Sequence, residues 1–268
     1  MRAIAWIALN VFRESVRDKV LYNLVAFAIL LMGASYLIGQ ITAGQDVKII
    51  KDLGLAATSI FGLFMAIFIG IGLVSKEVER RSIYSILAKP INRSQLVLGK
   101  YSGLVLTLAV NLAIMAAALY GVLAFLAWMT DPVVRRAWDA PALDPAMLKA
   151  IGLNFVELSI VTAIAVFFST FSTPILSAAL TFGLFLAGRF SADLRNFNQV
   201  VDSPAAAALA GALYWILPNL APFDVRAQVV HAQPVPIGQM ALATGYGVLY
   251  IAALLVGATL IFSRRDFK

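Results

Sequence analysis

The sequence predicts an all-α, polytopic membrane protein with six transmembrane helices. Of its 268 residues, 61% are hydrophobic and 13% are charged, and the mean hydropathy is +0.88. Soluble domains usually carry about 25% charged residues, so this chain has too few polar groups to cover a surface facing water. Long uncharged runs and clustered basic residues also support this class. The length fits a single transmembrane domain, residues 1–268, with short loops.

Six spans follow from the lengths of the uncharged runs. A transmembrane helix needs about 20 mainly apolar residues. The runs that meet this length are residues 20–45, 53–75, 101–130, 150–188 and 227–263. The fourth run is long enough for two helices, and its hydroxyl-rich stretch ending at Pro174 favours a turn. We divide it there, and we expect the short fifth span to extend past Arg189.

The amino-terminal residues 1–19 predict an amphipathic helix that lies along the membrane surface. Ile4, Ile7, Ala8, Val11 and Phe12 recur at helical spacing on one face, with charges on the other. Charged residues at 13–19 precede the first long apolar run, so no cleavable signal peptide is evident.

The segment 189–239 is predicted to lie outside the cell before the last span. Its shorter apolar run, 203–223, has an Ala-rich start followed by Tyr214, Trp215, Pro218 and Pro222. This composition favours a re-entrant or an interfacial helix over a full span. Such a helix could form a lid over the outer mouth or pack against the outer leaflet.

Six spans place both termini and the loop 76–100 on one side of the membrane. These three segments hold most of the 21 Lys and Arg residues. Because basic loops stay in the cytoplasm, we expect both termini there. The net charge of +7 therefore reflects membrane topology and contact with anionic lipid, and no nucleic-acid partner is expected.

The loop 76–100 is charged and also patterned. Apolar residues within 78–87 recur at roughly helical spacing, and Pro90 ends that helix. Asn92 and Gln95 then form a predicted capping box at the start of the third span. The loop is either an ordinary juxtamembrane helix that contacts anionic lipid or a rigid docking element for a partner. The candidate docking residues are Glu77, Glu79, Arg80, Arg81, Ser82, Tyr84, Pro90 and Arg93.

This loop resembles the hallmark of the ABC type-2 transport permeases. The resemblance is carried by Glu77-Val-Glu79-Arg80-Arg81-Ser82-Ile83-Tyr84, Leu87-Ala-Lys89-Pro90-Ile91-Asn92-Arg93 and Leu98-Gly99-Lys100, with Ser82 in the common Thr position. The stretches 168–174 and 217–223 are similar to features of the branch that contains permeases from nitrous oxide reductase maturation clusters.

The resemblance implies a membrane-spanning permease subunit of an ABC transporter, with export by alternating access in the inner membrane. It also implies that residues 1–19 are an elbow helix and that 77–89 form a coupling helix. The working unit would pair the chain with itself as a homodimer, or with a related permease, and with two copies of an ABC ATPase. ATP and Mg would bind to that ATPase, and this chain would bind no cofactor itself.

The chain is not expected to be an enzyme. No G-x-x-x-x-G-K-[ST] loop is present, because Leu98-Gly-Lys-Tyr101 lacks the upstream Gly and the following Ser or Thr. There are no cysteines, and the single histidine, His231, is more typical of a surface or packing residue than of a ligand. Neither catalytic residues nor a metal site are predicted.

Glu157 is the one acid inside a predicted span. A charge at the centre of a membrane helix costs about 2.5–3.5 kcal/mol or more, so such a residue is a functional candidate. The structural alternative is a protonated carboxyl, or one hydrogen-bonded to Asn111 or Asn154 on a packed helix. Small residues such as Gly70 and Gly72 are expected at close helix contacts.

Two other functions fit the composition. The chain could be a membrane scaffold or assembly factor that holds a partner enzyme and transports nothing. It could also be an ion-coupled secondary carrier, although a single intramembrane acid weakens this interpretation because proton and sodium relays usually use several polar groups.

Overall fold

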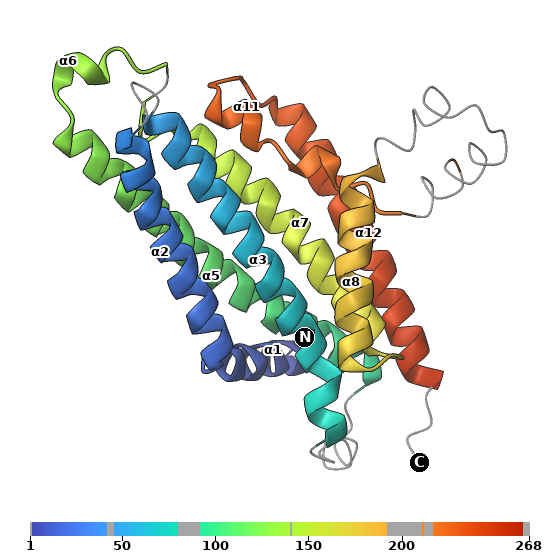
Figure 1. Ribbon diagram of the computed structural model, residues 1–268. Coiled ribbons are helices and arrows are strands. Elements are labelled where there is room, and N and C mark those ends of the chain that lie inside the picture. The colour runs from blue at the N-terminus through green and yellow to red at the C-terminus, as the bar shows by residue number, and fades with distance from the viewer. Residues whose placement is uncertain are drawn as a thin grey trace.

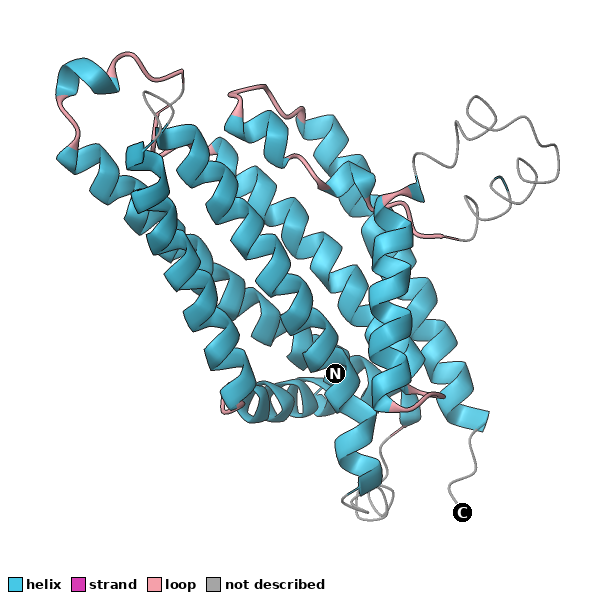
Figure 2. Ribbon diagram, viewed as in Figure 1, coloured by secondary structure: helices cyan, strands magenta, loops and turns pink. Residues whose placement is uncertain are grey.

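The computed structural model describes residues 2–41, 46–79, 92–139, 141–191, 211 and 217–264, and these contain helices and loops but no strand (Figure 2). The all-α class is therefore confirmed for the described residues. The elements are α1 Arg2–Ser15, α2 Lys19–Ile41, α3 Asp46–Glu79, α5 Arg93–Met129, α6 Pro132–Arg135, α7 Ala146–Ser169, α8 Pro174–Arg189, η2 Ala221–Phe223, α11 Arg226–Val230 and α12 Ile237–Arg264.

Each of the six predicted spans contains one main helix. In the described residues, α2, α3, α5, α7 and α12 are long and apolar enough to cross a membrane. The division of the fourth run is confirmed, because α7 ends at Ser169 and α8 begins at Pro174. However, α8 has only 16 residues and ends at Arg189, so it does not extend further as predicted. At 1.5 Å per residue it is about 24 Å long, shorter than the hydrocarbon core of about 30 Å.

The predicted start of the last span was wrong. Residues 226–230 form the separate short helix α11, and α12 begins only at Ile237. Pro234 and Pro236 lie between the two helices, and proline cannot donate the backbone hydrogen bond that a continuous helix needs. Ala232 also has a positive φ of 56°, which reverses the chain direction after α11.

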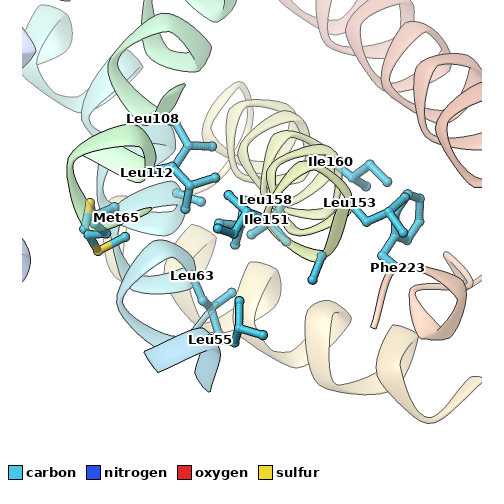
Figure 3. Packing of buried hydrophobic residues seen from close by; sticks show 14 of the residues in the cluster. Leu55, Leu63, Met65, Leu108, Leu112, Ile151, Leu153, Leu158, Ile160 and Phe223 are labelled. Carbon is cyan, nitrogen blue, oxygen red and sulfur yellow. The ribbon is translucent and has the colours of Figure 1, made fainter. Parts of the chain in front are cut away.

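Helix α7 lies at the centre of the bundle and contacts α3, α5, α8 and α12 (Figure 1). It is apolar around its whole circumference, as expected of a helix surrounded by others. Figure 3 shows Leu158 and Ile151 on one side of α7 and Ile160 and Leu153 on the side of Phe223.

The close approach predicted for Gly70 is confirmed. A side chain on Gly70 of α3 would collide with Ala165 of α7 and would lie 3.3 Å from the Thr162 carbonyl oxygen. Gly62, two turns earlier, faces Leu158 in the same way. The surroundings of Gly72 lie outside the part of the structure that is described. These glycines let the backbones of α3 and α7 pack directly together.

The two ends of the bundle differ. One end, here called the terminal end, carries α1, the carboxyl end of α3, the start of α5, the α7–α8 turn and the end of α12 (Figure 1). The opposite end carries α6, α11 and the starts of α3, α7 and α12. The start of α1, the end of α12, the end of α3 and the start of α5 therefore lie at the same end, as expected from six spans.

Helix α1 packs across the start of α5 at the terminal end (Figure 1). A side chain on Gly103 would lie only 2.5 Å from the Ala8 carbonyl oxygen, and one on Gly99 would lie 2.8 Å from Ile7 Cβ. The predicted apolar face is partly buried in this contact, whereas Trp6 is 70% exposed on the other side. The amino-terminal helix is thus confirmed. Gly99 and Gly103, one helical turn apart on α5, allow the two helices to approach closely.

Candidate functional site

Glu157 lies midway along α7, and its side chain is only 1% exposed. Arg189, the last residue of α8, lies beside it, with Nε 3.0 Å from Oε1 and Nη2 donating to Oε2 at 3.3 Å. The Nε contact is too far off the N–H direction to be a hydrogen bond, so Oε1 accepts none from the described residues. Arg189 is the reason that a carboxylate can be buried here, because its positive charge offsets the cost of desolvation.

The fold explains how Arg189 reaches Glu157. Helices α7 and α8 run antiparallel and are joined by a short turn after Ser169. Because α8 has 16 residues, it ends beside the middle of α7, where Glu157 is.

Arg189 also binds a second acid. Its Nη1 donates to Oδ2 of Asp224, which follows η2. One guanidinium therefore joins α7, α8 and the segment before α12, and its planar set of donors suits two carboxylates.

The partners predicted for Glu157 were wrong. Asn111 Nδ2 instead donates to the Thr107 carbonyl oxygen at 2.9 Å, and Asn154 Oδ1 is buried with no hydrogen-bond donor in the described residues. Sequence reasoning did not connect Arg189 with Glu157, because the two residues are 32 positions apart and belong to different predicted spans. A lone acid in a span was the signal that a basic residue on another helix was needed.

A small cavity lies next to this cluster. Ser59 of α3, Asn154 of α7, Arg189 and Phe223 are among its lining residues, and it holds about 30 Å³. This is enough for one or two water molecules. Among the described residues, three buried side-chain oxygens accept no hydrogen bond, and two of them, Asn154 Oδ1 and Glu157 Oε1, belong to residues that line the cavity, so water suits the site chemically.

Three further ion pairs lie toward the opposite end of the bundle. Lys51, 1% exposed on α3, lies 3.5 Å from Asp144 Oδ2 before α7. The remaining pairs are Lys48 with Asp139 and Arg226 Nε with Asp52 Oδ1 at 3.2 Å. These pairs join the first two turns of α3 to the loop before α7 and to the first residue of α11.

The structure describes only the two ends of the predicted docking loop. Glu77 and Glu79 lie in the last turn of α3, and Arg93 is the first residue of α5, so both flanks are at the terminal end. The other docking residues, Arg80, Arg81, Ser82, Tyr84 and Pro90, lie outside the described residues, as does most of the predicted coupling helix.

Asn92 occupies the N-cap position of α5 with extended backbone, as predicted. Its side chain makes no capping hydrogen bond, so the predicted capping box was wrong in that respect. The Asn92 carbonyl oxygen accepts instead from the Leu96 N–H at 3.1 Å, which begins the helix. His231 follows α11 with an exposed side chain, as expected for a surface residue.

The sequence that forms this bundle can be compared with models of known protein families. A family model described as ABC-2 family transporter protein matches residues 5–267, nearly the whole chain. The chain belongs to the ABC-2 transporter family. No curated protein matches it.

Membership of the ABC-2 family identifies the chain as a membrane component of an ABC transporter. The apolar helices agree with a multi-pass membrane protein. An ABC ATPase subunit is the partner that the family implies, because the family is a membrane component without an ATPase domain of its own.

The described end of the run 203–223 is not the predicted helix. Residues 217–220 are irregular, and η2 then forms a single 3-10 turn at Ala221–Phe223. Most of the earlier portion of that run lies outside the described residues. The described portion contacts the end of α8 through a hydrogen bond from the Leu220 N–H to the Gly188 carbonyl oxygen at 3.1 Å.

Proposed function

We propose that the chain is the permease subunit of an ATP-driven exporter that works by alternating access. The observation that supports this most directly is the continuity of α3, which runs as one helix from the bundle core to Glu79. The next long helix, α5, begins at Arg93 and has 37 residues, against 34 in α3. Force applied to the connection between them would pass straight into two core helices that both pack on α7.

The proposed working unit has two copies of this chain, or this chain and a related permease, and two ATPase subunits. ATP and Mg bind to the ATPases. The unit lies in the inner membrane with both termini in the cytoplasm, which is supported by the clustering of basic residues in the sequence segments 1–19, 76–100 and 264–268. Under this proposal residues 1–19 act as the elbow helix, and the contact of α1 with α5 would tie it to the coupling region.

The coupling helix at 77–89 and the start of α5 dock on the ATPase. The proposed docking and transmission residues are Glu77, Glu79, Arg80, Arg81, Ser82, Tyr84, Pro90 and Arg93. The charged members would pair with the ATPase surface. Pro90 would end the coupling helix sharply, so that a push on it turns α5 without being absorbed by bending.

The experiment is co-purification of the full chain with its cognate ATPase, followed by ATPase assays in lipid nanodiscs. Arg80→Glu with Arg81→Glu should abolish co-purification and stimulation of ATP hydrolysis. The matched control reverses the exposed Arg135 in α6 at the opposite end, Arg135→Glu, and should leave both intact.

Equal binding of the ATPase to the loop variant and the control would reject the docking role. An ATPase that binds but is never stimulated by this chain would favour the scaffold instead. Glu157→Gln provides a separate check on charge. Full transport by this variant would show that the negative charge at 157 has only a structural role.

A further inference from the structure

Residues 217–226, here called the strap, cross the bundle between α8 and α11 and are fastened to it by their backbone. The Leu220 N–H donates to the Gly188 carbonyl oxygen on α8 at 3.1 Å, and the Asn219 N–H donates to Tyr246 Oη on α12 at 2.9 Å. A side chain on Gly188 would lie 2.8 Å from the Pro218 carbonyl oxygen. Only glycine therefore lets the strap approach α8 this closely.

The second half of the strap alternates apolar and charged contacts. Phe223 and Val225 are buried, at 1% and 2% exposure. Asp224 binds Arg189 on α8, and Arg226 Nε lies 3.2 Å from Asp52 Oδ1 on α3. Two residues of opposite charge thus bind two different helices, and neither pair is fully desolvated, since Asp224 is 38% and Arg226 is 41% exposed.

The strap forms one side of the small cavity beside Glu157. Phe223, Asp224, Val225 and Arg226 form one wall, and α3, α7 and α8 supply the others. The buried wall includes oxygens of Asn154 and Glu157 that accept no hydrogen bond from the described residues. Lifting the strap would expose these acceptors to solvent, which favours the open state and partly offsets the loss of apolar contact.

We propose that the strap is a releasable latch, held shut by the Asp224–Arg189 and Arg226–Asp52 ion pairs, that closes the Glu157 cavity. Partly exposed ion pairs add little stability, so they can separate and re-form without disrupting the bundle. The buried Phe223 and Val225 return the strap to the same position each time. This inference concerns the chain alone and does not depend on the partner ATPase.

The test uses the absence of cysteine from the chain. Ser59→Cys places a single thiol in the wall of the cavity. The full chain in lipid nanodiscs is then treated with a small water-soluble methanethiosulfonate, and the rate of modification reports how often the strap opens. Asp52→Asn and Asp224→Asn should each raise this rate about two- to fivefold, as expected for weak, partly exposed pairs. Together they should multiply roughly.

Two controls separate release of the strap from general loosening. Asp139→Asn breaks the Lys48 ion pair at the same end without touching the strap, and it should leave the rate unchanged. Asp52→Arg combined with Arg226→Asp restores an ion pair in reversed order and should return the rate to that of Ser59→Cys alone.

Three results would overturn the latch. The first is an unchanged rate when Asp52 and Asp224 are both neutralised. The second is an equal increase from Asp139→Asn. The third concerns the reversed pair, Asp52→Arg with Arg226→Asp. The latch is overturned if this variant has the same thermal midpoint as Ser59→Cys alone but is modified no more slowly than Asp52→Asn.

Discussion

Arg189 at the end of α8 contacts Glu157 in the middle of α7, with Nε 3.0 Å from a carboxylate oxygen on a side chain that is 1% exposed. The contact joins two consecutive helices at the level where the shorter one ends.

Removing Arg189 should be more damaging than removing the whole pair. Arg189→Leu leaves a buried carboxylate without its cation and should lower the unfolding free energy by about 3 kcal/mol. Glu157→Leu combined with Arg189→Leu should recover most of this loss, because no unpaired charge remains in the core. Thermal and denaturant unfolding in detergent, followed by fluorescence of the 4 tryptophans, measures the difference. A double variant as unstable as Arg189→Leu would contradict this account.

The seat of α1 on α5 can be tested at one glycine. A methyl group at Gly103 would lie 2.5 Å from the Ala8 carbonyl oxygen, so Gly103→Ala must push the two helices apart. We expect a loss of about 1–3 kcal/mol, the usual cost of overpacking. Gly121→Ala on the same helix is the matched control, because no atom lies within 4 Å of the added methyl group. Equal unfolding midpoints for the two variants would show that α1 can move without penalty.

Lys51 and Asp144 should respond unequally to substitution. Asp144→Asn can keep the hydrogen bond from the Ala146 N–H but leaves the buried Lys51 ammonium without its anion. This should cost about 2 kcal/mol, as for a buried charged donor that loses its acceptor. Lys51→Met removes the charge and should cost less. The measurement compares the two unfolding midpoints, and that of Asp144→Asn should be the lower. A reversed order would mean that Asp144 does not stabilise the Lys51 ammonium.

The Lys48–Asp139 pair predicts a pH effect in a loop outside the candidate spans. Lys48 donates a hydrogen bond to the Asp139 carboxylate and attracts it, which holds the pKa of that carboxyl below its ordinary value. A lowered pKa means that the contribution to stability is present above the ordinary value and is lost as pH falls through the folded-state value. The parent should therefore exceed Asp139→Asn slightly in thermal midpoint at neutral pH and low salt. The two should converge in acid, and a constant difference across pH would refute the ionic origin.

Much of the fold could be predicted from the lengths of the apolar runs. All five long runs formed helices, although the fourth run holds both α7 and α8 and the fifth holds both α11 and α12. Helix α3 also continues into its charged flanks, because it begins at Asp46 and ends at Glu79, well outside the run 53–75. Hydrophobicity reports the portion that suits lipid, whereas backbone hydrogen bonds extend the helix further. The start of α12 was missed because the run was bounded by charges, while Pro234 and Pro236 set the true boundary.

The site was less predictable than the fold. Glu157 could be found as the one acid in a span, but its partners Arg189 and Asp224 come from residues far along the chain. Only the length of α8 and the path of the strap bring them together. The docking loop stays a prediction from its sequence pattern, and its flanks Glu79 and Arg93 lie at the terminal end.

Helix α3 has a further geometric consequence. Its 34 residues form one uninterrupted rod, about 50 Å long at 1.5 Å per residue, with about 40 Å between Asp52 and Glu79. Over that distance, a swing of only about 5° displaces one end relative to the other by roughly 3–4 Å. Such a displacement is as large as the 3.2 Å separation of Asp52 and Arg226. A small angular change at the Glu79 end is therefore enough to pull these opposite charges away from each other at the far end of the molecule.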